Sequence, residues 1–147
     1  MAEAMYWKEV TVNWGESDPF GLVYYPRIVA WFNDTEHEFF RTIGFPIDVM
    51  IREDRTTFVM GEIHFRFIGP AAYGDRVATT ITLAKIGKST LHWTCKARNA
   101  ASGAPVTEGR ATRAGLSVSW ARASAKRKQA HFNSSTVHNG SPACTRG

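Results

Sequence analysis

The sequence predicts an α+β domain in which an antiparallel sheet wraps around one long central helix. One extended helical pattern, over residues 26–43, lies close to the N-terminus. One segment rich in β-forming residues precedes it, and four such segments follow it without a second long helix between them. Strands grouped in this way around a single helix are typical of an antiparallel sheet with the helix packed on it.

The first strand is expected over residues 6–14. Val10, Val12 and Trp14 alternate there with polar residues, which is the pattern of a strand with one buried face. A loop rich in glycine and proline, residues 15–25, separates this strand from the helix.

The helix is expected to begin at Pro26, because a proline in the first turn gives up no intrahelical hydrogen bond. Gly44 is a natural C-terminal stop, since glycine readily adopts the left-handed conformation found there. The apolar residues recur at helical spacing and are expected to face the sheet: Ile28, Val29, Phe32, Phe39, Phe40 and Ile43.

Four strands are expected after the helix. The first covers residues 57–69, with a possible bulge at Gly61. Residues 75–87 and 89–99 read as a hairpin closed by a Gly-Lys-Ser turn. Residues 105–119 give a weaker strand signal at the end of the sheet.

The length and charge distribution predict one folded domain, residues 1–119, followed by a basic, disordered tail, residues 120–147. The formal net charge is +5, but the domain is neutral, and the whole surplus lies in the tail, which has no acidic residue. A nucleic-acid-binding domain would carry its excess of basic residues on the folded body. We therefore expect no nucleic-acid partner.

Cysteine usage and hydropathy favour a cytoplasmic protein that does not interact with membranes. Cys95 and Cys144 are the only cysteines, and their spacing fits neither a disulfide framework nor a zinc site. The N-terminus has no apolar signal region, and no apolar stretch approaches the ~18 residues of a membrane span.

The loop before the helix carries the best candidate for chemistry. Seven residues separate Asp18 from the expected helix start at Pro26, and Gly21 permits a backbone conformation that other residues resist. A helix N-terminus offers unpaired N–H groups and a partial positive charge, which can polarise a carbonyl oxygen. A nearby carboxylate can attack that carbonyl or activate water. The alternative is that Asp18 only caps its own turn.

The same loop resembles the signature of the 4-hydroxybenzoyl-CoA thioesterase family. The matching residues are Gly15, Asp18, Pro19, Gly21, Val23, Tyr25 and Pro26. The helix that follows, with Trp31 and Phe32, is also similar to that family, as is the order of strands. The resemblance covers about residues 6–113.

The resemblance implies a hotdog fold that forms dimers or tetramers and binds acyl-CoA across the dimer interface. Asp18 would be the catalytic nucleophile or general base, and the backbone N–H of Tyr25 would polarise the thioester carbonyl. Gly21, Asn33 and Lys88 would belong to the substrate-binding site, with Lys88 contacting the CoA phosphates. No metal or organic cofactor would be needed.

Two departures from the family bear on the substrate. Asn33 stands where the 4-hydroxybenzoyl enzyme has an acidic residue that recognises the substrate hydroxyl. Ile86 and Gly87 stand where further basic contacts to CoA would be expected. The leading interpretation is an acyl-CoA thioesterase for an aromatic, 4-hydroxybenzoyl-like substrate. The alternatives are an enoyl-CoA hydratase of the same fold and a non-catalytic acyl-CoA-binding module.

Overall fold

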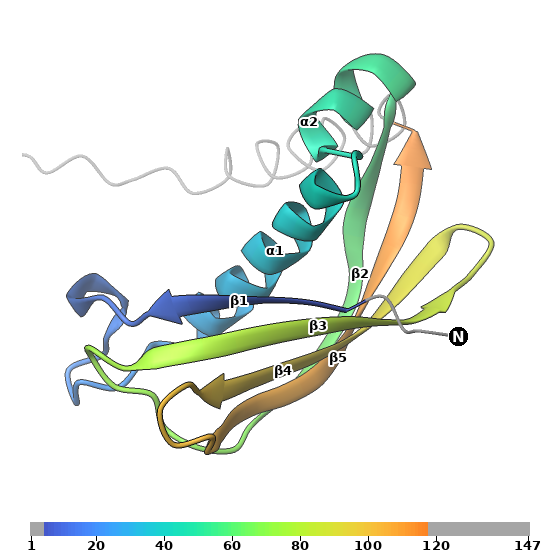
Figure 1. The fold of residues 1–147 in the computed structure, drawn as a ribbon. Helices are drawn as coiled ribbons and strands as arrows, with labels where there is room; N and C mark the ends of the chain where they lie inside the picture. The colour runs from blue at the N-terminus through green and yellow to red at the C-terminus, as the bar shows by residue number, and fades with distance from the viewer. Residues whose placement is uncertain (1–4, 118–147) are drawn as a thin grey trace, which may run out of the picture.

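The computed structural model describes residues 5–117, so the predicted tail over residues 120–147 lies outside the described residues. The elements follow one another as β1 Met5–Thr11, the 3-10 turn η1 Trp14–Glu16, α1 Tyr25–Thr42, α2 Ile47–Val49, the π-helical turn η2 Met50–Asp54, β2 Thr56–Phe67, β3 Arg76–Ile86, β4 Thr90–Asn99 and β5 Pro105–Ser117. Figure 1 shows α1 lying across one face of a strongly curved sheet. This confirms the predicted antiparallel sheet around one long helix.

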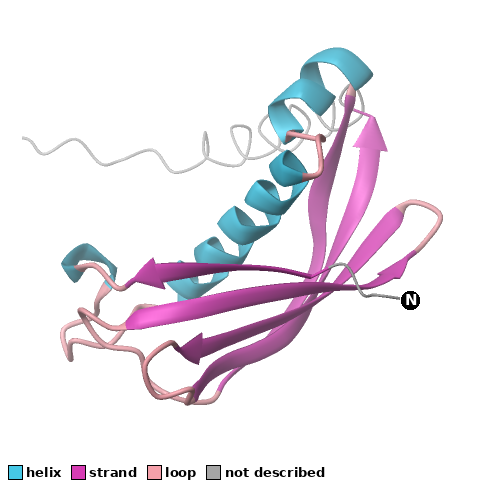
Figure 2. Ribbon diagram, in the orientation of Figure 1, coloured by secondary structure: helices cyan, strands magenta, loops and turns pink. Residues whose placement is uncertain are grey.

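The five strands form one sheet in the order β1-β3-β4-β5-β2, and all neighbours are antiparallel. β2 and β1 are therefore the two edges of the sheet (Figure 2). The register of β2 against β5 shifts between Met60 and Glu62. This shift confirms the bulge that was predicted at Gly61.

α1 begins and ends close to the predicted positions. Pro26 lies in its first turn, and Gly44, just beyond its end, has a φ of +87°. This left-handed conformation is the one that favours glycine after a helix. Within residues 5–117, no helix is both long enough and apolar enough to cross a membrane.

The core lies between α1 and the concave face of the sheet. Its buried members on the helix are Ile28, Trp31, Phe32 and Phe40. Trp93 of β4 is 2% exposed and meets the rings of Phe39 and Phe40 edge-on. Ile43, which was expected to face the core, is 48% exposed, because α1 has already ended at Thr42.

Polar contacts fix the position of the helix on the sheet. The buried hydroxyls of Thr35 on α1 and Thr79 on β3 are 2.9 Å apart and share a hydrogen bond. Nearer the C-terminal end of α1, Glu38 forms an ion pair with Lys8 of β1. A buried hydroxyl pair is satisfied only in one alignment, so it favours a single placement of α1.

Two predicted strands differ from the observed ones. β1 ends at Thr11 rather than at residue 14, because the Glu16 carboxylate accepts a hydrogen bond from the Asn13 N–H (2.8 Å) and the chain turns there. Trp14 is consequently outside the strand and 71% exposed. The final strand, expected to be weak, is the longest of the five with 13 residues, and it pairs with β4 on one side and with β2 on the other.

Candidate active site

Asp18 closes a tight turn directly before α1. Its Oδ1 accepts hydrogen bonds from the backbone N–H groups of Phe20 (2.8 Å) and Leu22 (3.1 Å). Gly21, with a φ of +78°, donates its own N–H to the Asp18 carbonyl oxygen (2.9 Å). Oδ1 of Asp18 therefore caps the turn. Oδ2 has no hydrogen-bond partner among residues 5–117.

The turn is tied both to the sheet and to the helix. The Val23 N–H donates to the carbonyl oxygen of Ala71, just before β3 (2.8 Å). The Glu16 side chain accepts a hydrogen bond from the indole N–H of Trp31 on α1 (2.9 Å), and its carbonyl oxygen accepts one from the Tyr24 N–H (2.8 Å). These contacts hold the Asp18 carboxylate at the N-terminal end of α1.

The first turn of α1 leaves a backbone donor unused. No side chain caps the helix at Tyr24, and Pro26 has no N–H. Arg27 already donates to the Tyr24 carbonyl oxygen (2.9 Å). The Tyr25 N–H has no partner among the described residues. A free N–H at the positive end of the helix dipole is suited to an oxygen that gains negative charge.

Exposed aromatic side chains surround this end of the helix. The Tyr25 ring, 57% exposed, lies 5.7 Å from the ring of Phe67 at the end of β2 and 5.3 Å from the ring of Tyr24. Phe20, inside the turn itself, is 88% exposed. Flat apolar surfaces beside a polar turn can bind a planar acyl group.

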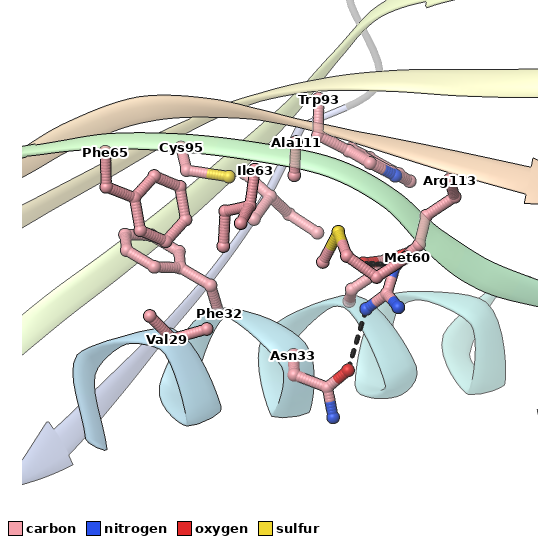
Figure 3. A pocket seen from close by; sticks show the side chains of 12 residues that line it. Val29, Phe32, Asn33, Met60, Ile63, Phe65, Trp93, Cys95, Ala111 and Arg113 are labelled. Carbon is pink, nitrogen blue, oxygen red and sulfur yellow. Dashed lines mark hydrogen bonds and ion pairs between the residues drawn. The ribbon is translucent and has the colours of Figure 1, made fainter. Parts of the chain in front are cut away.

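Further along α1, Asn33 belongs to a polar network under the sheet (Figure 3). The guanidinium of Arg113 on β5 donates from Nε to both carboxylate oxygens of Glu36 (3.0 and 2.9 Å) and from Nη2 to Oδ1 of Asn33 (2.7 Å). Oδ1 can accept one more hydrogen bond, and the Asn33 amide N–H groups have no partner among residues 5–117. Figure 3 shows this nitrogen pointing away from the sheet.

The Glu36–Arg113 ion pair was not anticipated from the sequence. Both residues are more than 90% buried. Burial raises the pKa of Glu36, and this effect outweighs the charge and hydrogen bond of Arg113, which lower that pKa. The spacing of the sequence could have predicted the burial of Glu36. It lies four residues from Phe32 and four from Phe40, both core residues, so it falls on the buried face of α1.

Of the five site residues predicted from the sequence, the structure brings three together. Asp18, Gly21 and Tyr25 meet at the start of α1, and Asn33 lies about 12 Å further along the helix at a rise of 1.5 Å per residue. Lys88, exposed in the β3–β4 turn, lies at the far end of the sheet. The 11-residue strand β3 separates it from the Asp18 loop by about 35 Å within one chain.

An antiparallel sheet curved around one helix, with a capped aspartate turn at the helix start, places this chain among hotdog-fold proteins. The model of the thioesterase-like superfamily matches residues 12–142, and the chain belongs to that superfamily. The match extends further toward the C-terminus than the motif resemblance, which ended near residue 113. No curated protein sequence is significantly similar to this chain.

Solved structures share the fold at low sequence identity. The 1,4-dihydroxy-2-naphthoyl-CoA thioesterase Slr0204 from Synechocystis superposes with a TM-score of 0.74 at 14% identity, over 78% of this chain and 84% of that one. The BH1999 gentisyl-coenzyme A thioesterase gives 0.69 at 21% identity, over 76% and 88% of the two chains. The DHNA-CoA thioesterase from Staphylococcus aureus gives 0.71 at 14% identity, over 88% and 95%.

Proposed function

We propose that this protein is an acyl-CoA thioesterase that hydrolyses an aromatic acyl-CoA to the free acid and CoA. The observation that carries the proposal is the Asp18 turn: one carboxylate oxygen is fixed, the other is free, and both lie at the N-terminus of α1, where the Tyr25 N–H is unpaired. Membership of the thioesterase-like superfamily supports the same reaction.

In the proposed reaction, the thioester carbonyl oxygen accepts a hydrogen bond from the Tyr25 N–H. Asp18 either removes a proton from water that attacks the carbonyl carbon, or attacks that carbon itself to form an anhydride that water then hydrolyses. The carbon–sulfur bond breaks, and the thiolate of CoA takes up a proton. The helix dipole stabilises the developing oxyanion in both routes.

The proposed active unit is a dimer joined through β2. This strand is 12 residues long, lies at an edge of the sheet, and carries exposed apolar side chains at Met60, Ile63 and Phe67. An unpaired apolar edge favours pairing with another strand. A two-fold axis at the middle of β2 would join two sheets antiparallel and cover these side chains in both copies.

This pairing also explains where Lys88 acts. The Asp18 loop adjoins the Phe67 end of β2, through the contact between Tyr25 and Phe67. The β3–β4 turn adjoins the other end, because Ser89 accepts a hydrogen bond from the N–H of Gly115, which pairs with Phe58. Antiparallel pairing places opposite ends side by side. Lys88 of a second copy would then approach the Asp18 loop and contact the CoA phosphates.

An aromatic acyl group is proposed because the thioesterases of similar structure are named for gentisyl-CoA and dihydroxynaphthoyl-CoA, and because aromatic side chains surround the turn. Asn33 would meet the acyl group through its side-chain amide, which can donate hydrogen bonds from nitrogen and accept one more at Oδ1.

The test is release of free thiol from a panel of acyl-CoAs by the wild type and by Asp18→Asn. Asparagine retains an Oδ1 that can accept the Phe20 and Leu22 N–H bonds, so the turn is expected to survive, while the base or nucleophile is lost. We expect turnover to fall by about 10²–10⁴-fold. Asp75→Asn is the matched control: Asp75 also caps a turn, through the Ala72 N–H (2.9 Å), and should tolerate the change.

Folded wild-type protein that releases no thiol from any acyl-CoA would overturn the proposal, as would an active Asp18→Asn variant. Binding of acyl-CoA without turnover would identify the non-catalytic binding module. Consumption of an enoyl-CoA without release of CoA would identify the hydratase instead.

A further inference from the structure

A cavity lined by hydrophobic side chains lies at the opposite end of α1 from Asp18. Its volume is about 490 Å³, within the range of about 300–1,000 Å³ typical of small-molecule sites. The end of α1 forms one wall with Phe39 and Phe40, followed by Ile43 just beyond the helix, and the β3–β4 hairpin forms the other wall with Leu83, Ile86 and Leu91. Every lining side chain is hydrophobic.

We propose that this cavity binds the acyl group of the substrate, and that the preferred aromatic acyl groups are apolar fused rings of about ten carbon atoms. The inference rests on the proposed thioesterase function and goes beyond it by naming the substrate class. It also separates this chain from enzymes that recognise a hydroxylated single ring.

The position of the cavity supports this occupant. Within one chain, the cavity begins at Phe39, about 20 Å along the helix from Tyr25, which is too far for one thioester to reach Asp18 and fill the cavity. The cavity includes Phe58, however, and thus adjoins the end of β2 that antiparallel self-pairing brings to the Asp18 loop of the second copy. Asp18 of one chain would therefore act on an acyl group held by the other.

The chemistry of the lining sets the substrate class. Apart from the indole N–H of Trp93, the described residues around the cavity offer no side-chain nitrogen, oxygen or charge, so a hydroxyl placed there would lose most of its hydrogen bonds to water. Aliphatic chains and fused rings have no hydrogen bonds to water to lose, and their burial in the cavity is favourable. The size exceeds what a benzoyl group would fill, and unfilled apolar space forfeits contacts.

The first measurement is kcat/KM for butanoyl-, octanoyl-, decanoyl-, 4-hydroxybenzoyl- and 2-naphthoyl-CoA. We expect kcat/KM to rise by about fourfold for each added methylene up to decanoyl, from the transfer energy of a buried methylene. 2-Naphthoyl-CoA should exceed both decanoyl- and 4-hydroxybenzoyl-CoA. A preference for any of the other four acyl groups would overturn the proposal.

Variants that fill the cavity locate the site. Ile86→Trp, at the exposed rim, and Leu83→Trp, deeper in the cavity, should abolish the preference for long groups, so that kcat/KM for decanoyl-CoA falls to the value that the same variant shows for butanoyl-CoA. Lys85→Trp is the matched control, because Lys85 lies between them on β3 but pairs with His92 on the outer face. Unchanged chain-length preference in both folded cavity variants would overturn the proposal.

Subunit complementation tests whether the site is shared between chains. Asp18→Asn and Ile86→Trp homodimers should both be nearly inactive on decanoyl-CoA. A mixed dimer has one site that combines an intact Asp18 with an intact cavity, so mixing should restore activity to as much as half that of the wild type per heterodimer. If proven heterodimers regain no activity, Asp18 and the cavity belong to a site within one chain, and the shared site is overturned.

A binding measurement keeps this inference separate from the proposed function. Decyl-CoA, a thioether that cannot be hydrolysed, should bind Asp18→Asn at least 10-fold more tightly than butyl-CoA thioether, and Leu83→Trp should remove the difference. This outcome stands even if no turnover is found. If a chain truncated after residue 119 binds decyl-CoA far more tightly than the full chain, the C-terminal segment occupies the cavity and the proposal fails.

Discussion

The two oxygens of the Asp18 carboxylate have different surroundings, although they belong to one side chain. Oδ1 is held by the N–H groups of Phe20 and Leu22, while Oδ2 has no partner among residues 5–117. A residue that only capped a turn would serve as well in the form of asparagine. The proposed role depends on the negative charge, which is why the comparison of aspartate with asparagine separates the two functions.

Replacing Gly21 by alanine tests whether the conformation of the Asp18 turn is needed for activity. Its φ of +78° would cost an alanine about 1–2 kcal/mol, although nothing lies within 4 Å of the position its Cβ would take. Gly103, in the turn before β5, has a φ of +73° and the same open surroundings. Gly21→Ala and Gly103→Ala should therefore lose similar stability in urea unfolding, but only Gly21→Ala should lose thioesterase activity. Equal activity in both would separate the turn from catalysis.

The raised pKa of Glu36 predicts how the free energy of unfolding changes with pH. Burial raises its pKa in the folded state above the ordinary value of 4.5, so the folded protein retains a proton that the unfolded chain has released. The contribution of this proton is complete below about pH 4.5 and is lost as the pH rises through the raised pKa. Urea unfolding of the wild type and Glu36→Gln between pH 4.5 and 8 should show the wild type losing stability relative to the variant. A relative gain would show that Arg113 dominates.

At the scale of elements, the Glu36–Arg113 pair joins α1 to β5 through the core. Arg113→Leu would leave the Glu36 carboxylate buried without its partner, and we expect a loss of about 3–5 kcal/mol in the free energy of unfolding. Replacing both residues with leucine should recover much of this loss. The exposed pair Arg98–Glu108, with its atoms 3.9 Å apart, is the control, and Arg98→Leu should cost less than about 1 kcal/mol.

The sequence predicted elements well where one periodicity dominates and less well where side chains redirect the chain. The helix was located within one residue at each end, because Pro26 and Gly44 mark its limits. β1 was predicted too long, because the hydrogen bond from Asn13 to Glu16 that ends it leaves no trace in hydropathy. The burial of Glu36 was missed because a charged residue on an apolar stripe requires a partner that is distant in sequence.

At the scale of the whole molecule, the candidate site residues lie at two opposite ends of the structure. The turn residues converge at one end of the helix, whereas Lys88 and the apolar cavity lie at the other. The sequence motif made Asp18 and Tyr25 candidates for the site, but it could not show this separation, because spacing along a chain does not report which ends of a sheet come together. Only the strand order and register reveal it.

The edge strand β2 supplies the corresponding prediction. Ile63→Lys, at an exposed apolar position of this edge, should weaken the dimer and lower thioesterase activity in parallel, because it places a charge in the proposed interface. Met5→Lys, at a 61% exposed position on the opposite edge strand, is the control and should change neither. Sedimentation equilibrium measures the first effect and thiol release the second. A stable Ile63→Lys dimer would exclude pairing through β2.

Cys95 of β4 has a consequence for how this fold can be followed in solution. The thiol is 2% exposed, and burial raises its pKa to about 12. It is therefore shielded both from contact with an alkylating reagent and from conversion to the reactive thiolate. In a Cys144→Ser background, the rate at which Cys95 is labelled would report how often the core opens. No labelling is expected until the sheet separates from the helix. Labelling of Cys95 can therefore be used to measure the rate of transient unfolding. Because it is buried, this thiol also does not react in assays that measure the thiol of released CoA.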